Sequence, residues 1–309
     1  LNSEPVYFDV TQDASTDEDG VTVIEVIKPN MAQKGVIKIS KSGEVFSSVT
    51  EADGLYQPVF SVQGLPGAVY EITAAEDIIT PDGTTRYSKG EIVDTVTTDE
   101  TGLAESKPLY LGKYEIREIK APYGMVLNTE IRTAELVYAG QEIEITETSA
   151  SFYNERQKAA VSLEKVLEQN KTFGIGMNGE ISAVTFGLFA AEDLTAADGS
   201  VIPADGLLEI LSVDENGHAV CKTDLPFGGF YLKELSTDEH YILSNEKHPI
   251  VFEYAGQDAA LVEIKANDGK PIDNDLIYGE IHGLKKDEDG NSLGGAVIGL
   301  FKADCTEFT

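Results

Sequence analysis

The sequence repeats itself at a fixed spacing of 116 residues, and this repeat limits the possible folds more than any other feature. Three segments recur at that spacing: 127–130 at 243–246, 138–141 at 254–257, and 114–118 at 230–234. Similarity at a fixed period is the signature of a repeat architecture, in which each copy is one structural unit. The chain is therefore predicted to contain two copies of one domain.

Both ends of the chain resemble parts of the same unit. Leu1–Glu4 resembles Leu127–Glu130, and Gly294–Phe301 resembles Val184–Phe189. We therefore interpret the chain as an internal piece of a longer polypeptide. The expected organisation is the C-terminal part of a preceding repeat at 1–30, complete domains at 31–157 and 158–278, and the N-terminal part of a following repeat at 279–309.

Short alternating segments fill each unit. Val36–Ile39, Tyr114–Arg117 and Phe230–Lys233 alternate apolar with polar residues, and turn signals such as Asn216-Gly217 separate such segments. Short strands at regular spacing with these turns are typical of a sandwich or a barrel. The predicted fold class is all-β, as tandem immunoglobulin-like β-sandwich domains with Greek-key connections.

The charge balance argues against several classes of partner. Lys and Arg total 23 against 54 Asp and Glu, for a net charge of −31. Nucleic-acid binding requires basic patches, so no nucleic-acid partner is expected. Docking on anionic lipid is disfavoured for the same reason. The sequence has no apolar run long enough to span a membrane, so direct membrane insertion is not expected. The two cysteines, Cys221 and Cys305, are too few for a disulfide framework.

The sequence predicts neither a metal site nor a cofactor site. The four histidines lack the spacing of zinc ligands. The acidic turn that begins at Asp287 has Ser292 and Ile298 where an EF-hand calcium loop has glycine and glutamate. Neither a glycine-rich phosphate loop nor a Gly-x-Ser-x-Gly elbow is present. We expect no cofactor and no multiple-turnover enzyme.

Polar residues recur on strand faces that are otherwise apolar. A spacing of 11 residues occurs three times, at Asn30 and Lys41, Asn154 and Lys165, and Asn274 and Lys285. Each lysine is expected to end a strand on the same face as the apolar residues before it, because side chains alternate along a strand. Glu118 and Glu234 also continue apolar faces. Unpaired buried charges are costly, so the recurrence requires a chemical explanation.

Such a trio of side chains can react with itself. Burial lowers the pKa of a lysine and raises that of a glutamate. A neutral amine is a nucleophile, and a protonated acid can polarise an amide carbonyl and transfer protons. Attack on the asparagine amide would expel ammonia and leave a Lys–Asn isopeptide bond. The alternative is that these lysines are ordinary salt-bridged residues at strand ends.

Three motifs together suggest a family. They are the box Tyr114-x-Ile116-x-Glu118-x-x-Ala121-Pro122-x-Gly124, the entry Leu65–Ala68, and the turn Thr98–Gly102 with its counterpart Val213–Gly217. This pattern resembles the prealbumin-like B-type domains (SpaA-like, Cna B-type) of Gram-positive collagen adhesins and pilins. The second unit departs from it, because Leu235-Ser236-Thr237-Asp238 follows Glu234 without the Ala-Pro pair.

The resemblance implies a role for each recurring residue. Lys41 and Asn154 would form one crosslink with Glu118 as the catalytic acid. Lys165 and Asn274 would form the second, with Glu234 as the acid. Asn274 lies between two aspartates, either of which could replace it as partner. Asn30 and Lys285 belong to the partial copies and have no glutamate box of their own.

The leading functional hypothesis is structural. Crosslinked sandwiches would form a stalk or shaft segment of an extracellular, cell-wall-anchored adhesin or pilin, with neighbouring repeat domains as partners. The alternative is a module that binds a host matrix protein or a glycan, which requires an exposed aromatic or apolar patch. The aromatic content of 8% without tryptophan counts mildly against a glycan platform. An intermolecular enzyme is the least favoured class.

Overall fold

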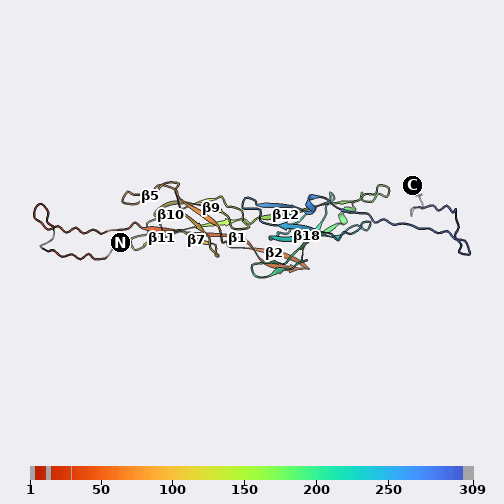
Figure 1. Cartoon of the computed structure of the whole chain (residues 1–309), viewed down its shortest axis with the longest axis horizontal. Helices are drawn as coiled ribbons and strands as arrows, with labels where there is room; N and C mark the ends of the chain where they lie inside the picture. Colours follow the sequence, from red (N-terminus) through yellow and green to blue (C-terminus); the bar gives the residue numbers. More distant parts are fainter. Residues whose placement is uncertain (1–3, 12–14, 29, 302–309) are drawn as a thin grey trace.

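The computed structural model describes residues 4–11, 15–28 and 30–301. Strands make up 47% and helices 3% of these described residues, which confirms the predicted all-β class. Two strand-rich units follow one another along the long axis of the molecule (Figure 1). Cys305 and Leu1 to Ser3 of the opening repeat signature lie outside the described residues, and the expected domain boundaries stay predictions.

The first unit contains β1 to β11, and the second contains β12 to β21. The strands of the first unit are β1 (Lys34–Ala52), β2 (Leu55–Gly64), β3 (Val69–Ala74), β4 (Ile78–Ile79), β5 (Thr85–Tyr87), β6 (Ile92–Thr97), β7 (Leu103–Glu105), β8 (Leu109–Tyr110), β9 (Gly112–Lys120), β10 (Ile131–Leu136) and β11 (Ile145–Asn154). Those of the second are β12 (Lys158–Leu167), β13 (Thr185–Ala190), β14 (Leu194–Thr195), β15 (Val201–Ile202), β16 (Leu207–Ser212), β17 (His218–Val220), β18 (Gly228–Ser236), β19 (Lys247–Phe252), β20 (Leu261–Lys265) and β21 (Ile272–Asn274). Both helices among the described residues, η1 (Glu180–Ala183) and η2 (Ala266–Gly269), are 3-10 turns, too short to cross a membrane.

Each unit pairs a sheet that contains its first and last strands with a second, four-stranded sheet. In the first unit the order β11-β1-β2 faces the order β10-β9-β3-β6. The second unit repeats this with β17-β12-β20 and β16-β13-β18-β19, and β21 also pairs with β12. The first strand runs parallel to the last in both units. Because nothing in the second unit corresponds to β2, the two copies differ at that edge.

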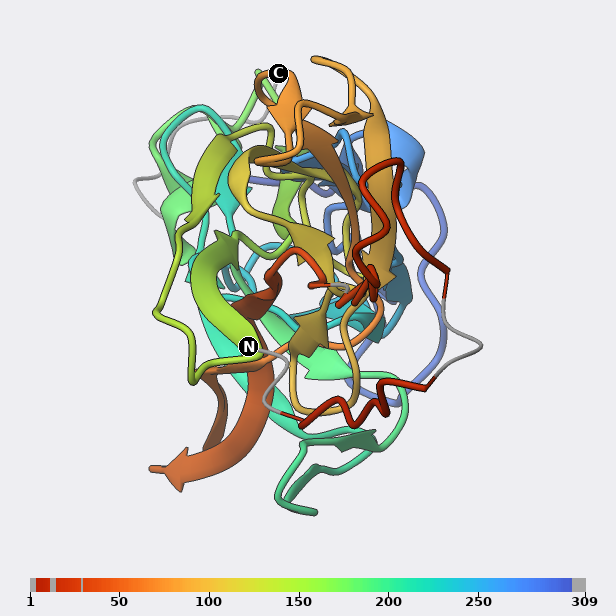
Figure 2. The ribbon, with the colours of Figure 1, turned by 90° about the vertical axis from the view of Figure 1, so that its left-hand side faces the viewer.

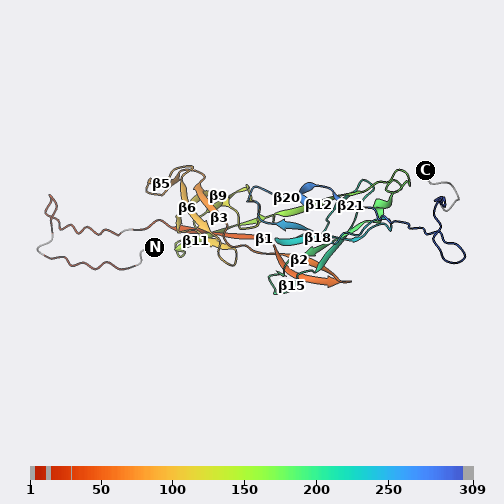
Figure 3. The same ribbon diagram turned by 45° about the vertical axis from the view of Figure 1, so that its right-hand side comes forward.

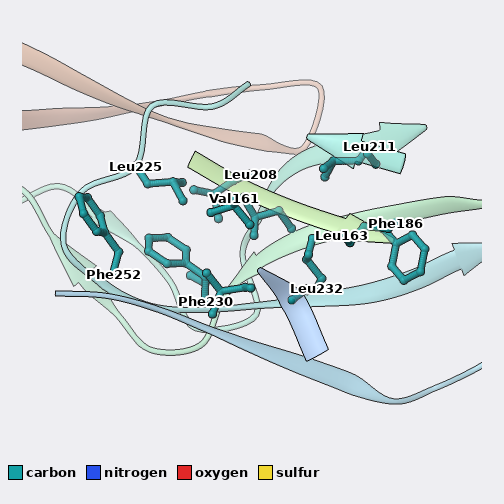
Figure 4. Packing of buried hydrophobic residues seen from close by; sticks show 14 of the residues in the cluster. Val161, Leu163, Phe186, Leu208, Leu211, Leu225, Phe230, Leu232 and Phe252 are labelled. Carbon is teal, nitrogen blue, oxygen red and sulfur yellow. The ribbon is translucent and has the colours of Figure 1, made fainter. Parts of the chain in front are cut away.

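Each unit has its own apolar core between its sheets. In the first unit Ile37, Ile39, Tyr70, Tyr114 and Phe152 are among the buried residues. In the second unit the buried side chains of β12 meet those of β13, β16 and β18 from the facing sheet (Figure 4). The alternation of apolar residues along the strands therefore points one face of each sheet inward.

The hairpin of β1 and β2 extends beyond the first unit and packs against the second. Its side chains Phe46, Val49 and Tyr56 pack on the second core. The Ala197 amide donates to the Phe46 carbonyl at 3.0 Å, and the Val49 amide donates to Ser200 Oγ at 2.8 Å. The orange end of β1 projects from the body in Figure 2. In Figure 3 the hairpin lies along one side of the second unit, where β1 contacts β15 and β2 contacts β16.

Further contacts also hold the two units together. The Arg156 guanidinium lies 3.7 Å over the Phe60 ring and forms an ion pair with Asp224 of the second unit. The Leu127 amide donates to the Gln257 carbonyl at 2.8 Å. The two units are therefore joined by several separate contacts in addition to the connecting chain.

Candidate functional site

Both candidate lysines lie on the first strand of their unit and are buried. Lys41 on β1 is 2% exposed, and Lys165 on β12 is 1% exposed. The expectation that each lysine ends a strand is wrong for Lys285, which lies in no strand, and for Lys41. The strand β1 continues to Ala52, because β2 pairs with its second half and keeps its backbone hydrogen-bonded.

The candidate asparagines lie on the parallel last strands, in the same register in both units. Gly43 is the Cα partner of Asn154, and Leu167 is the partner of Asn274. Each lysine therefore lies two residues before the partner of its asparagine. Residues two apart on a strand share a face, so the long lysine side chain reaches diagonally to the amide.

The first cluster brings Lys41, Asn154 and Glu118 together. Lys41 Nζ donates to Asn154 Oδ1 and lies 3.1 Å from Glu118 Oε1. Asn154 Nδ2 donates to the same carboxyl oxygen at 3.1 Å. The lysine and glutamate side chains have no exposed surface. The amine, the amide and the acid therefore contact one another away from water.

The second cluster repeats the arrangement with Lys165, Asn274 and Glu234. Lys165 Nζ donates to Asn274 Oδ1 at 2.7 Å and lies 3.9 Å from Glu234 Oε1. Asn274 Nδ2 donates to Glu234 Oε1 at 2.9 Å and to Oε2 at 3.0 Å. It also donates to Thr237 Oγ1 at 3.0 Å. The amide is thus held with its carbonyl oxygen toward the lysine amine.

A strand irregularity follows each glutamate. The pairing of β3 with β9 shifts register between Val69 and Tyr70, directly after Glu118 on β9. The pairing of β13 with β18 shifts between Thr185 and Phe186, directly after Glu234 on β18. Such a bulge re-aims a side chain and is common beside functional sites. The backbone amides of Asn128 and Ser244 each donate to the Oε2 atom of the nearby glutamate at 2.8 Å.

A tight turn supports each lysine from outside. The Lys41 amide donates to the Gly102 carbonyl at 2.7 Å, and Lys165 makes the same bond to Gly217. Gly102 has φ of +80°, and a Cβ there would lie 2.4 Å from the Lys41 carbonyl oxygen. Glycine is therefore required at this turn by both its backbone conformation and its close approach to β1.

Burial changes the protonation of both amines. Desolvation lowers the pKa of Lys41, and the charge and hydrogen bond of Glu118 oppose that effect. Desolvation lowers the pKa of Lys165 to about 8, against the opposing charge of Glu234. Buried His248 on β19 lies near this second cluster, and its pKa is lowered mainly by desolvation. A lowered pKa makes it easier for each lysine to pass a proton to its neighbouring carboxyl group and become a nucleophile.

The remaining sequence candidates lie outside these clusters. Asn30 and Lys285 are exposed, as are Asp273 and Asp275 beside Asn274. The aspartates therefore face away from Lys165. Among the described residues, no group of three or more His, Cys, Asp or Glu side chains could hold a metal ion.

Two hydroxyl-bearing residues next to the clusters were not anticipated from the sequence. Tyr70 is fully buried on β3 opposite Glu118, and Thr237 contacts Asn274. Aligning the two copies at their spacing of 116 residues would have found them, because Tyr70 aligns with Phe186 and Thr237 aligns with Ala121.

Comparison with known proteins identifies the fold of the first unit. Residues 61–150 match the family model of the SpaA prealbumin-like fold domain. This segment is a SpaA prealbumin-like domain. The resemblance inferred from the glutamate box is thereby confirmed. The matched SpaA segment contains Glu118 and Tyr70, whereas Lys41 and Asn154 lie outside it.

A curated relative and two solved structures have sequences or folds similar to this chain. The trypsin-resistant surface T6 protein of Streptococcus pyogenes serotype M6 is 36% identical over 81 residues, or 26% of this chain and 15% of that protein. The Bacillus anthracis TIE protein aligns with a TM-score of 0.49 and 18% identity over 88% of this chain and 42% of that chain. GBS52, the minor pilin of Streptococcus agalactiae, aligns with a TM-score of 0.28 and 15% identity over 81% of this chain and all of that one.

Proposed function

We propose that this chain is a stalk or shaft segment of a bacterial surface adhesin or pilin, in which each unit forms one intramolecular isopeptide bond. One observation carries the proposal: an amine, a primary amide and a carboxyl group are buried together in both units, in the same strand register. A surface protein and pilins among the similar proteins support the location at the cell surface.

The proposed reaction balances without a cofactor. In the second unit Lys165 passes a proton to Glu234, and the neutral Nζ forms a bond to the side-chain carbonyl carbon of Asn274. Glu234 returns the proton to the amide nitrogen as the bond from that carbon to Nδ2 breaks. The products are a secondary amide and ammonia, which leaves as ammonium with the last proton. The first unit would use Lys41, Asn154 and Glu118 in the same way.

The bond would stabilise each unit by closing a long loop. The two crosslinked pairs are separated by 113 and 109 residues. In the chain-entropy model for disulfides, a loop of roughly 100 residues contributes about 4.7 kcal/mol to stability. Unlike a disulfide, an amide bond resists reductants, so the effect would persist in any redox environment.

Intact mass spectrometry tests the proposal directly. The folded chain should weigh two ammonia molecules less than its sequence requires. Glu118→Gln should lose only one, because the amide that replaces the acid cannot transfer the proton, while the second unit still reacts. A wild-type mass equal to the sequence value would exclude the crosslinks. A Glu118→Gln variant that still loses two ammonia molecules would exclude the role of the glutamate.

The alternative, a module that binds a host matrix protein or a glycan, stays a prediction. Binding of the purified chain to a panel of matrix proteins and glycans separates the two functions. A stalk segment binds none of them, whereas a binding module retains at least one ligand at physiological salt.

A further inference from the structure

A hydroxyl group lies beside each lysine–asparagine–glutamate cluster, but a different element supplies it in each unit. In the first unit the group is Tyr70 on β3, which is the Cα partner of Glu118. In the second unit the corresponding residue is Phe186, the partner of Glu234, which has no hydroxyl. There the group is Thr237, after β18, and the residue that aligns with it in the first unit is Ala121. Each cluster thus has one neighbouring hydroxyl group, but the two copies supply that group from different sequence positions.

The Tyr70 hydroxyl is buried near the Glu118 carboxyl group, but among the described residues none of its contacts has the geometry of a full hydrogen bond. The centroid of the Tyr70 ring lies 4.8 Å from the centroid of the Phe152 ring and 5.9 Å from Lys41 Nζ. Burial, next the charge of Glu118, and then the interaction of the phenol with that carboxyl group raise the pKa of the phenol, so the hydroxyl keeps its proton. A buried donor without a full hydrogen bond costs free energy, which suggests that Tyr70 has another role.

The Thr237 hydroxyl, in contrast, already has a hydrogen-bond partner. Its Oγ1 accepts a hydrogen bond from Asn274 Nδ2, the nitrogen that leaves in the proposed reaction. In the first unit the Asn154 Nδ2 atom donates to Glu118 Oε1, and Ala121 offers no equivalent acceptor. The first unit therefore lacks one contact to the amide, and has an unused donor beside the acid instead.

We propose that the Tyr70 and Thr237 hydroxyls are positioning groups for isopeptide formation, each serving only its own unit. This inference rests on the proposed function. Tyr70 would donate to the Glu118 carboxyl group as that group gives up its proton, and would thereby stabilise the carboxylate form. Thr237 would hold the Asn274 amide so that its carbonyl carbon faces Lys165. In its own unit, each hydroxyl would orient the glutamic acid and the asparagine amide for the proton transfer between them.

A refolding experiment measures both reactions in one chain. The chain is kept in denaturant from synthesis onward, refolded by dilution, and quenched with acid at successive times. Peptide mapping then gives the rate of each crosslink. Tyr70→Phe should slow the Lys41–Asn154 reaction roughly tenfold, the effect of losing one hydrogen bond, and leave the Lys165–Asn274 reaction unchanged. Thr237→Ala should do the reverse.

Rescue by the exchanged hydroxyl separates positioning from packing. Adding Ala121→Thr to Tyr70→Phe should restore the rate in the first unit, and adding Phe186→Tyr to Thr237→Ala should restore it in the second. Circular dichroism of each refolded variant checks that the fold is intact. The phenylalanine variant is conservative, because the second unit carries that residue naturally at this place.

Each outcome has a definite meaning. A wild-type chain without crosslinks refutes the proposed function itself, before any variant is compared. Crosslinks that form at the wild-type rate in folded Tyr70→Phe and Thr237→Ala refute the positioning role alone. A loss of rate that neither Ala121→Thr nor Phe186→Tyr restores also refutes the positioning role, because the original hydroxyl would then act through packing. Selective slowing with rescue in either unit supports it.

Discussion

Removing the two lysine amines from water changes their pKa more than their pairing with a carboxyl group does. A buried ion pair gains Coulomb energy but loses hydration, and the hydration loss is often larger. For both Lys41 and Lys165 desolvation is the largest influence on the pKa, and the adjacent carboxyl group only partly opposes it. The clusters are therefore weak as ion pairs and well suited to a reaction that removes the charges.

The lowered pKa of Lys165 predicts a pH dependence for the second crosslink. Below pH about 8 the lysine holds the proton that it passes to Glu234, and above that pH the proton is lost to solvent. Because the proposed step needs this proton, the crosslinking rate should be flat from pH 6 to 7.5 and should fall as pH rises through 8 to 9. Quenched refolding at each pH, followed by peptide mapping, gives the rate.

Folding must be faster than crosslinking for that measurement to be informative. Tyrosine fluorescence during refolding at each pH is the control, since it reports packing and not the bond. A rate that rises through pH 8 would contradict the proposal, because it would mean that the neutral amine alone limits the reaction.

Among the local elements, the turn at Gly102 should be sensitive to substitution. Gly102→Ala places a Cβ against three backbone atoms, of Lys41, Leu65 and Gly64, in a backbone with positive φ. We expect a loss of more than about 1 kcal/mol in unfolding free energy and a slower first crosslink, because β1 must shift. Denaturant unfolding of the refolded variant, with Glu118→Gln added to remove the bond, measures the loss.

Gly83 offers a matched control within the same unit. It also has positive φ, at +79°, but a Cβ there would meet nothing within 4 Å. Gly83→Ala therefore carries the backbone strain without the clash. If both substitutions cost the same free energy, the close approach of Gly102 to Lys41 would have no role.

The β1–β2 hairpin should couple the two units. Replacing Val49 and Tyr56 with serine removes side chains that pack on the second core. In a background without crosslinks, we expect the second unit to melt at a lower temperature, and independently of the first. Differential scanning calorimetry should resolve two transitions. Val62→Ser, on the same hairpin but 60% exposed, should leave the melting profile unchanged.

The sequence predicts the strand faces well and the strand ends poorly. Alternation along 114–118 has only two possible orientations, and the apolar residues select the one that turns Glu118 inward. The length of β1 cannot be predicted from such alternation. Residues beyond Lys41 gain their partners from β2 and from the second unit, and such distant contacts leave no local pattern. Tyr70 was missed because tyrosine in an apolar run is typical of any core.

Across the whole molecule, the proposed bonds connect the ends of each unit. The first and last strands run parallel, so a pulling force enters at the start of one and leaves at the end of the other. A bond between them carries that force directly. Single-molecule pulling of the wild-type chain should show no unfolding step from either unit. Lys41→Ala should add a step of up to about 370–410 Å, the extended length of the 113 residues otherwise enclosed.

The second unit of that variant supplies the internal control, since its bond is untouched. One additional step per molecule is the expected result. A wild-type chain that lengthens by the same amount under the same load would contradict the proposed crosslinks.

The position of the β1–β2 hairpin has a mechanical consequence for a rod made of such units. The paired part of the hairpin, from Ser42 to Gly64, lies between Lys41 and Asn154 in the chain, so a crosslink would enclose it and a longitudinal load would not pass through it. Its contacts with the second unit lie to one side of the axis, where they resist bending at the junction. Tensile strength and bending stiffness would then reside in separate residues, and a change in the hairpin could alter how far the rod flexes without altering the force needed to break it.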